Sequence, residues 1–434
     1  MKRFAFIMAG LLMFSAANAQ DKEALKAQKE AQKAAETALK KAKQTYELSI
    51  PNPQYGRKET DFTKLENSLP LIQEAMKSEY TKDNPQTWKT AADIELEYYK
   101  KLENETKADP DNEALKQKYI EASSSLLTYC IKYDSLLIIN PKAKPDEVKN
   151  QHTMYQQYAV NPAIQLLQAS QNYSNSDKQE DLKLGAKYSE EFLYAMEQSN
   201  LMKDFKNESL EDWKTYAKAF RAQSYLSIEG TPEDKIVAAY TDLLTTKYKG
   251  VAYQSLSNYY REKNPAKQNE YLQAGIEALK NEPEQKDLRA NFAIMLMQNQ
   301  YQSGDKEGFK KTAELVKTEF ADNDNAINAY LMEGQMAFEA KDYDTAKAIF
   351  LAAKEKYPEE SKTLLMAARS AWMKAQAGGS KRADMDEAIT LFKQLETENP
   401  DDPELWGESL YILYNNTQQL NLAAPYKKYY KEAK

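Results

Sequence analysis

The stretch Asn325–Pro358 constrains the fold more than any other part of the sequence. Its pattern predicts two amphipathic helices separated by a short polar break at 340–342. The small or apolar residues that recur every three or four positions are Tyr330, Gly334, Phe338, Ala346, Phe350 and Ala353. We expect Gly334 and Ala346 to face each other where the two antiparallel helices cross, because only small side chains let the axes approach closely. Pro358 ends the second helix because it has no N–H and disfavours the α conformation in the preceding residue.

This stretch resembles a tetratricopeptide repeat, a motif of about 34 residues. The residues that match the motif are Gly334, Tyr343, Ala346, Phe350, Ala353 and Pro358. Tyr330 stands where the motif prefers Trp, while Glu333 and Ala337 depart from the expected Leu and Tyr. The resemblance implies an all-α fold, an α-α superhelix (solenoid) of tetratricopeptide-like helix pairs. It does not imply a chemistry, because such repeats are binding scaffolds for many unrelated ligands.

The N-terminus has the features of a secretory signal peptide. Lys2 and Arg3 precede an apolar run over 4–14, and Ala17-Asn18-Ala19 provides a cleavage signal. We therefore predict a signal peptide over 1–19, cleavage after Ala19, and a periplasmic or secreted mature chain without a stable membrane insertion. The cleavage site is not followed by Cys, which disfavours a lipid anchor.

Composition narrows the classes of function. The chain carries a net charge of −7, which does not suit nucleic acid binding, because that depends on basic surfaces that neutralise phosphates. Its single cysteine, Cys130, excludes an intrachain disulfide. Only 12 of 434 residues are Gly. Tight turns, β-bulges and phosphate-binding loops depend on Gly, so its scarcity favours helices with short connections.

Breaks rich in Pro, Gly and Asn divide the rest of the chain. They predict an N-terminal Ala/Lys-rich helix over 20–50, divergent helical repeats over 54–140, divergent tetratricopeptide-like repeats over 146–283, and tetratricopeptide repeats with C-terminal capping helices over 284–434. Helices are expected over 233–248 and 422–431, among others, and a loop at 377–382 interrupts the pair that follows Pro358. The phrase Thr81–Trp88 resembles the connection between repeats in secreted tetratricopeptide proteins of diderm bacteria, in which Trp opens the next helix.

Residues with catalytic or ligand chemistry are few. His152 is the only histidine, so a zinc site would need Cys or carboxylate partners at ligand spacing, and we interpret it as structural. Cys130 lies in an apolar helical run and is expected to be a small buried hydrophobe. Asp322–Asn325 is better interpreted as a helix cap than as a calcium loop, because Ile327 replaces the required Gly. We therefore predict no enzyme activity, no cofactor and no metal.

The resemblance also predicts a binding surface. In a tetratricopeptide repeat, four positions of the first helix point into the concave groove. The corresponding residues here are Asn328, Leu331, Gln335 and Phe338, with Leu365, Arg369 and Trp372 beside them on the next repeat. Rings and Arg often dominate the binding energy of an interface. The other interpretation of Phe338 and Trp372 is that they pack between neighbouring repeats.

The leading hypothesis is a non-catalytic secreted or periplasmic scaffold or adaptor that binds a protein or peptide in a concave repeat groove. The alternative is a glycan-binding component of an envelope nutrient-uptake system, because some such proteins carry similar repeats. Thirty Tyr residues could supply rings that stack on sugars, or could simply pack between helices. The sequence identifies neither the partner nor the oligomeric state.

Overall fold

The computed structural model describes residues 2–379 and 381–430, with the backbone alone described for residues 2–22. Regular structure in these residues is helical, and the only extended pairing among them is an isolated antiparallel bridge between Asn52 and Arg57. The all-α prediction is therefore confirmed. The chain divides into two compact units, Met1–Thr246 and Lys247–Lys434.

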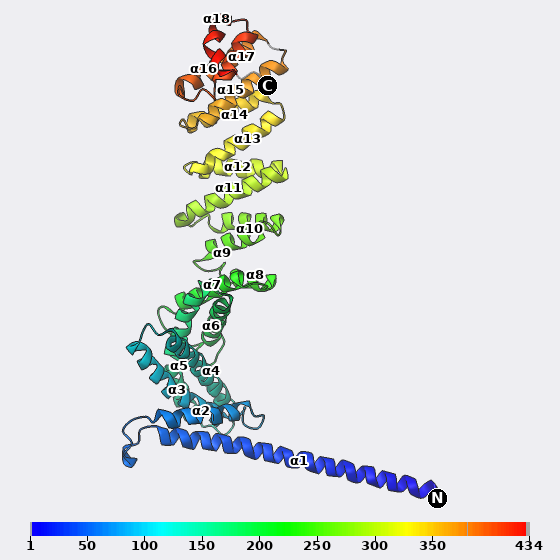
Figure 1. The fold of residues 1–434 in the computed structure, drawn as a ribbon, viewed down its shortest axis with the longest axis vertical. Coiled ribbons are helices and arrows are strands. Elements are labelled where there is room, and N and C mark those ends of the chain that lie inside the picture. The colour runs from blue at the N-terminus through cyan, green and yellow to red at the C-terminus, as the bar shows by residue number, and fades with distance from the viewer. Residues whose placement is uncertain (1, 380, 431–434) are drawn as a thin grey trace. The chain divides into compact units, whose positions relative to one another are not determined.

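The first unit contains helices α1 to α8 (Figure 1). Their bounds are α1 Lys2–Ser49, α2 Phe62–Lys77, α3 Pro85–Ala108, α4 Glu113–Ile138, α5 Pro145–Ser174, α6 Gln179–Glu197, α7 Leu210–Ser227 and α8 Glu233–Thr241, with a short 3₁₀ turn at Pro53–Tyr55.

The second unit contains helices α9 to α18. Their bounds are α9 Lys249–Tyr260, α10 Pro265–Ala278, α11 Lys286–Ser303, α12 Lys306–Glu319, α13 Ile327–Glu339, α14 Tyr343–Lys356, α15 Ser361–Ala377, α16 Arg382–Glu398, α17 Gly407–Asn416 and α18 Leu420–Ala423. Short 3₁₀ turns occupy Pro283–Gln285, Asp324–Ala326 and Ala424–Tyr429.

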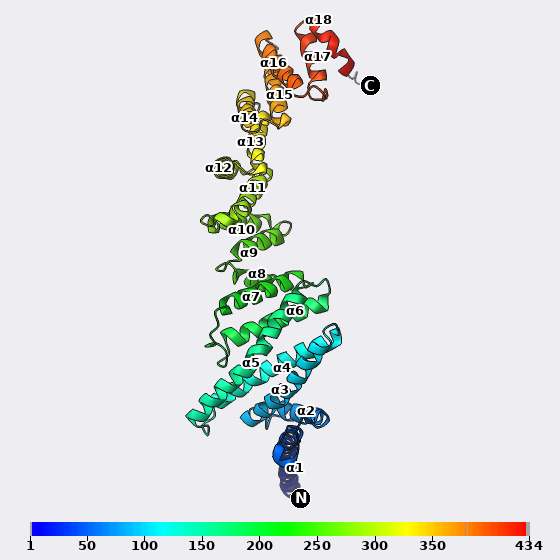
Figure 2. The ribbon, with the colours of Figure 1, turned by 90° about the vertical axis from the view of Figure 1, so that its left-hand side faces the viewer.

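Within each unit, helices pack mainly against their neighbours in the chain, as Figures 1 and 2 show. Some also contact the next helix but one, namely α1 with α3, α4 with α6, α5 with α7, and α11 with α13. The apolar cores follow this order, so that one cluster joins α3 to α7 and another joins α10 to α13. This nearest-neighbour packing is how a helical solenoid is stabilised.

A repeated turn defines the register of the pairs in the second unit. Gly304 and Lys341, 37 positions apart, both have positive φ, at 75° and 63°. The N–H of Gly304 bonds the carbonyl of Tyr301, and the N–H of Lys341 bonds that of Phe338. Asp305 and Asp342 then cap the following helices through their carboxylates. The break expected at 340–342 is thus a helix end, a left-handed residue and an Asp cap.

Tryptophans anchor two of the connections between helix pairs. Trp88 lies in the first turn of α3, and its Nε1 donates to the carbonyl of Lys82 at 2.6 Å. Trp406 precedes α17, and its Nε1 donates to the carbonyl of Asn399 at 2.8 Å. An indole N–H that is removed from water usually finds a hydrogen-bond partner, and here each connection supplies a carbonyl to it. α3 itself begins three residues before Trp88, at Pro85, with Asn84 as its cap.

The residue nearest to the missing side chain of Gly334 is Phe350, and the predicted close approach of Gly334 and Ala346 stays a prediction. A Cβ placed on Gly334 would lie 2.6 Å from ring atoms of Phe350, which is one turn further along α14 than Ala346. Ala346 is fully buried in the same cluster, with Phe350 and Ala367. The physical reason is that the large ring, rather than a second small residue, fills the space left by the missing side chain.

One departure from the repeat motif has a structural explanation. Glu333 stands where the motif expects Leu, and its Oε2 lies 2.7 Å from Nζ of Lys317 on α12. Burial lowers the pKa of Lys317, whereas the hydrogen bond and the charge of Glu333 raise it, and the net result is a raised pKa. An ion pair between neighbouring pairs therefore replaces an apolar contact.

The second half of the Ala-rich helix α1 packs on the rest of the first unit. Ala35, Ala38, Leu39 and Ala42 are buried, and Leu39 and Ala42 belong to a cluster with Leu65 and Ile72 of α2. Residues 23–34 are exposed. The buried Ala35, Ala38 and Ala42 recur at three and four positions, as expected for one face of a helix.

Two expected helix bounds are corrected. α8 ends at Thr241 rather than near 248, because Thr and Asp in this stretch favour turns over helix continuation. The helix expected over 422–431 is instead the short α18 and a 3₁₀ turn, because Pro425 cannot donate within a helix; residues 431–434 lie outside the described residues.

None of the described helices combines the length and apolar character needed to cross a membrane. The unit boundary after Thr246 falls inside the segment 146–283 that the sequence groups together. The finer repeat boundaries stay predictions, as does the signal peptide.

Candidate partner-binding surface

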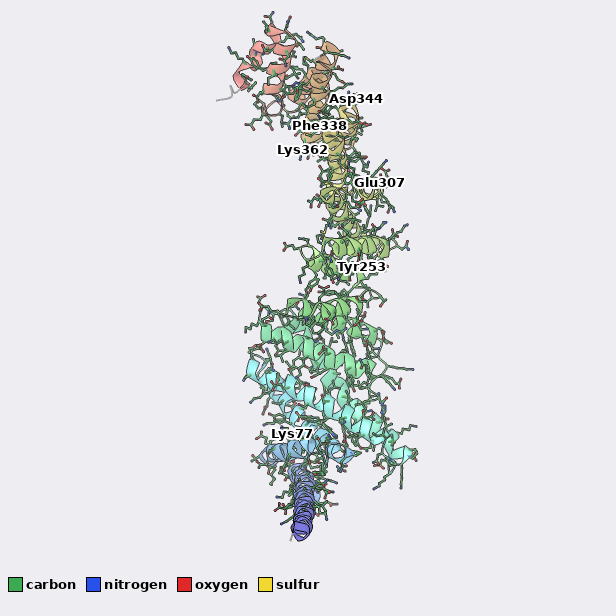
Figure 3. All side chains as sticks on the ribbon, turned by 90° about the vertical axis from the view of Figure 1, so that its right-hand side faces the viewer. Lys77, Tyr253, Glu307, Phe338, Asp344 and Lys362 are labelled. Carbon is green, nitrogen blue, oxygen red and sulfur yellow. The ribbon has the colours of Figure 1, made fainter. Side chains whose placement is uncertain are left out.

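The predicted surface residues belong to the first helices of two consecutive pairs, α13 and α15. Asn328, Leu331, Gln335 and Phe338 are spaced at three, four and three, so they form one stripe along α13. Both helices contact α14. Figure 3 labels Phe338 of α13, Asp344 of α14 and Lys362 of α15 in the same part of the second unit.

On α13 the two apolar residues of the stripe are partly buried against the core. Leu331 and Phe338 are half-buried against the cluster of Ala346, Phe350 and Ala367, and the Phe338 ring lies 5.4 Å from that of Tyr343, edge to face. Gln335 donates to Oε1 of Glu339 at 2.8 Å. The half-buried Asn328 side chain makes no hydrogen bond to another described residue.

On α15 the arrangement is similar, with one exposed charge. Leu365 and Trp372 are half-buried against the last apolar cluster, and the Trp372 ring lies 6.1 Å from that of Phe392, edge to face. Nε1 of Trp372 is buried without a partner among the described residues. Arg369 is exposed and forms no ion pair in the described part of the chain. The ring contacts support the packing interpretation for Phe338 and Trp372.

The register of the repeated turn extends the stripe to α11, which the sequence analysis did not identify. Stepping back 37 positions from the stripe of α13 gives Asn291, Ile294, Gln298 and Tyr301. Each helix then carries an amide, an aliphatic residue, an amide and a ring in the same order. α15 keeps the aliphatic residue and the ring but has Lys362 and Arg369 in the two amide positions. The signal was present in the sequence, but only the matching turns at Gly304 and Lys341 show the 37-residue offset.

A group of polar residues that the sequence analysis missed lies in the first unit, between α3 and α5. The phenol of Tyr155 donates to Asp93, and Nζ of Lys89 lies 2.9 Å from Asp93 Oδ2 and 3.2 Å from the Tyr155 oxygen. Tyr155 is fully buried, and burial together with the charge of Asp93 raises its pKa. The Tyr133 ring of α4 lies 4.6 Å away, edge to face. This network links α3 to α5, and its ammonium, carboxylate and phenol groups all have partners within it.

His152 and Cys130 lie in the same part of the first unit. Nδ1 of His152 lies 2.8 Å from Oδ1 of Asp134, whose Oδ2 is buried without a partner among the described residues. Burial raises the pKa of Asp134, and the hydrogen bond from His152 opposes this. Cys130 is fully buried, as predicted, and burial raises the pKa of its thiol, so the thiolate needed for a nucleophile is suppressed.

Glu95 on α3 is a buried carboxyl of a different kind. Only 7% of it is exposed, and burial raises its pKa to about 8. It makes no hydrogen bond or ion pair to another described residue, so its neutral form is favoured near neutral pH. Among the described residues, no group of three or more His, Cys, Asp or Glu side chains could hold a metal ion. The absence of a cofactor stays a prediction.

Comparison with known proteins gives likeness of fold only. No protein-family model matches the chain. None of the curated proteins matches it in sequence.

Among solved structures, yeast Tom70 is 12% identical and matches 92% of this chain and 91% of its own, with a TM-score of 0.31. The human IFIT1 dimer with PPP-AAAA is 12% identical over 85% of this chain and 79% of its own, with a TM-score of 0.26. A circular tandem repeat protein is 11% identical over 92% and 95%, with a TM-score of 0.21. Such TM-scores and identities carry no argument about function, and the helical repeat assignment rests on the packing and turns described above.

Proposed function

We propose that this protein is a non-catalytic scaffold or adaptor that binds a protein or peptide along the first helices α11, α13 and α15 of its second unit. The observation that carries the proposal is the recurring stripe of apolar residues, half-buried on α13 and α15 and flanked by amides and by an exposed Arg369 that forms no ion pair with the described residues. On α11 the ring of Tyr301 is half-buried and Ile294 is buried. Rings and aliphatic side chains can be covered by a partner, while amides and a guanidinium fix its orientation.

A protein partner suits the rings better than a glycan. A sugar is held by stacking on an open ring face, whereas Phe338 and Trp372 are engaged edge to face by Tyr343 and Phe392. The suppressed thiolate of Cys130 and the partnered network of Lys89, Asp93 and Tyr155 support a non-catalytic role. The net charge of −7 supports a partner other than nucleic acid.

We also propose that the chain is exported and that its signal peptide is cleaved after Ala19, which places it in the periplasm or outside the cell. The basic residues Lys2 and Arg3, the apolar run and the small-residue cleavage signal support this. N-terminal sequencing of the mature protein from fractionated cells tests it. A first residue other than Gln20, or recovery of the protein from the cytoplasm, contradicts the proposal.

The binding proposal is tested by immobilising the mature protein, recovering partners from envelope extracts, and measuring the affinity of each purified partner for wild type and Arg369→Glu. Charge reversal at an exposed interface position is expected to weaken binding severalfold with an unchanged melting temperature. Lys310→Glu on α12 is the matched control, since Lys310 is also exposed and forms no ion pair with the described residues. A partner bound equally by all three proteins rules out this surface, and binding on a glycan array without any protein partner favours the alternative.

A further inference from the structure

A hollow of about 460 Å³ lies where the turn after α11 meets the end of α13. Its walls include the rings of Tyr301 and Phe309, the side chains of Gln300 and Lys306, and the carboxylates of Asp305 and Glu339. The Tyr301 and Phe309 ring centroids are 5.8 Å apart. The hollow lies at the turn edge of two consecutive pairs and is separate from most of the stripe proposed above.

The hollow has acceptors that are not fully used. Oε1 of Gln300 is buried and has no donor among the described residues. The terminal torsion of a Gln amide is soft, so this oxygen can turn towards a donor in the hollow at little cost. Glu339 accepts one hydrogen bond, from Gln335, and forms no ion pair in the described part of the chain. A buried acceptor without a donor costs free energy, so a ligand that donates a hydrogen bond to Gln300 removes this cost when it binds.

The electrostatic sign of the hollow is negative. The lining has two carboxylates and one ammonium, that of Lys306. Both α11 and α13 end here, so the negative ends of their dipoles add partial negative charge. The positive end of α12 is already capped by Asp305, whose Oδ1 accepts from the N–H of Gly308 at 2.9 Å. Burial, with the charge of Glu339, raises the pKa of Tyr301, which places its phenol within the field of that carboxylate.

We propose that this hollow binds an alkylguanidinium or alkylammonium group, with the alkyl part on the half-buried ring of Tyr301 and the cationic head between Glu339 and Gln300. Ring faces attract cations, and a carboxylate and an amide oxygen accept from the several N–H groups of such a head. The group can come from a free amine or from a basic side chain of a polypeptide. The proposal does not depend on the stripe of α11, α13 and α15 being a binding surface.

The test is calorimetric titration of the full mature chain with three probes at low salt. Agmatine represents a free alkylguanidinium, Ac-Gly-Arg-Gly-NH₂ a side chain, and the peptide with citrulline in place of Arg a neutral isostere. At least one charged probe is expected to bind, and the citrulline peptide about fivefold more weakly than the Arg peptide. The charged probe that binds more tightly identifies the source.

Variants localise the binding. Glu339→Gln keeps the acceptor for Gln335 and should weaken the charged probes by about three- to fivefold. Tyr301→Leu should weaken them by about two- to fivefold. Glu355→Gln on α14 is the control, because Glu355 is exposed, lies outside the hollow and forms no ion pair with the described residues. Failure of both charged probes to bind, equal binding of the citrulline peptide, or unchanged affinity in Glu339→Gln with an unchanged melting temperature overturns the proposal.

Discussion

The ring of Phe350 occupies the space beside Gly334 so closely that a Cβ on Gly334 would lie 2.6 Å from two of its atoms. Real Cβ atoms are not found so near to other heavy atoms, so any side chain at this position must displace the ring. Phe350 is only 1% exposed and shares its cluster with Ala346 and Ala367, which leaves it little room to move. This contact sets how closely α13 and α14 approach.

Gly334→Leu should therefore overpack the crossing and reduce the free energy of unfolding by roughly 1–3 kcal/mol. Ala346→Leu, at a fully buried position of the same cluster, should act in the same direction. Ala352→Leu on the exposed face of α14 is the control and should change little. The measurement is urea unfolding followed by circular dichroism. Equal midpoints for Gly334→Leu and wild type would show that the helices do not approach here.

Trp372→Ala tests whether this ring packs or is free for a partner. The ring is half-buried and contacts Phe392, so its removal should lower the melting temperature by several degrees, with a cost below the ~3–5 kcal/mol of a fully buried ring. Trp372→Phe keeps an aromatic contact and should recover part of the loss. A melting temperature unchanged in Trp372→Ala would contradict the packing contact.

The buried carboxyl of Glu95 predicts a pH-dependent stability. Its pKa is about 8 in the fold against an ordinary value of 4.5, so between these values the folded state binds more protons than the unfolded state. Stability is then highest at the acid end of this window and falls as pH rises towards 8, by at most about 1.4 kcal/mol per pH unit. Glu95→Gln should flatten this part of the profile and raise the melting temperature at pH 8.

The matched control is Glu208→Gln, because Glu208 is exposed and unpaired among the described residues. Melting temperatures from pH 5 to pH 9 compare the three proteins. A wild-type profile with the same slope as Glu95→Gln would show that the carboxyl titrates normally.

The pair of His152 and Asp134 predicts an asymmetry between two variants. Asp134 is 1% exposed, so His152→Ala leaves a buried carboxylate without its donor and should cost about 1–3 kcal/mol or more. Asp134→Asn removes the charge and keeps an oxygen that accepts from the ring, so it should cost less. Chemical unfolding at pH 7 measures both. The reverse order would mean that the carboxylate is stabilised by other groups.

Much of the helical architecture could be predicted because its causes are local. Asn84, Asp305 and Asp342 each cap a helix through a backbone N–H no more than three residues away. The apolar spacing of α13 and α14 is likewise a pattern within about 30 consecutive residues. The predicted helix bounds were wrong where the helical spacing of apolar residues competes with residues that favour turns, as after Thr241 and around Pro425. The close approach of the Phe350 ring to Gly334 was not predicted, because spacing shows that a small residue is needed and not what fills the space.

The sequence by itself determined that the chain is helical, where its pairs break, and that Cys130 lies in an apolar face. It also predicted the stripe on α13, whose spacing is a property of one helix. Tertiary structure alone decided that Lys89 and Asp93 meet Tyr155, more than 60 positions away, and that Glu95 is enclosed without a partner. Tertiary structure also brought Gln300, Tyr301 and Glu339 around one hollow. The physical reason is that periodicity specifies which face of a helix is apolar, whereas the partner of that face depends on the length and conformation of every connection between the two helices.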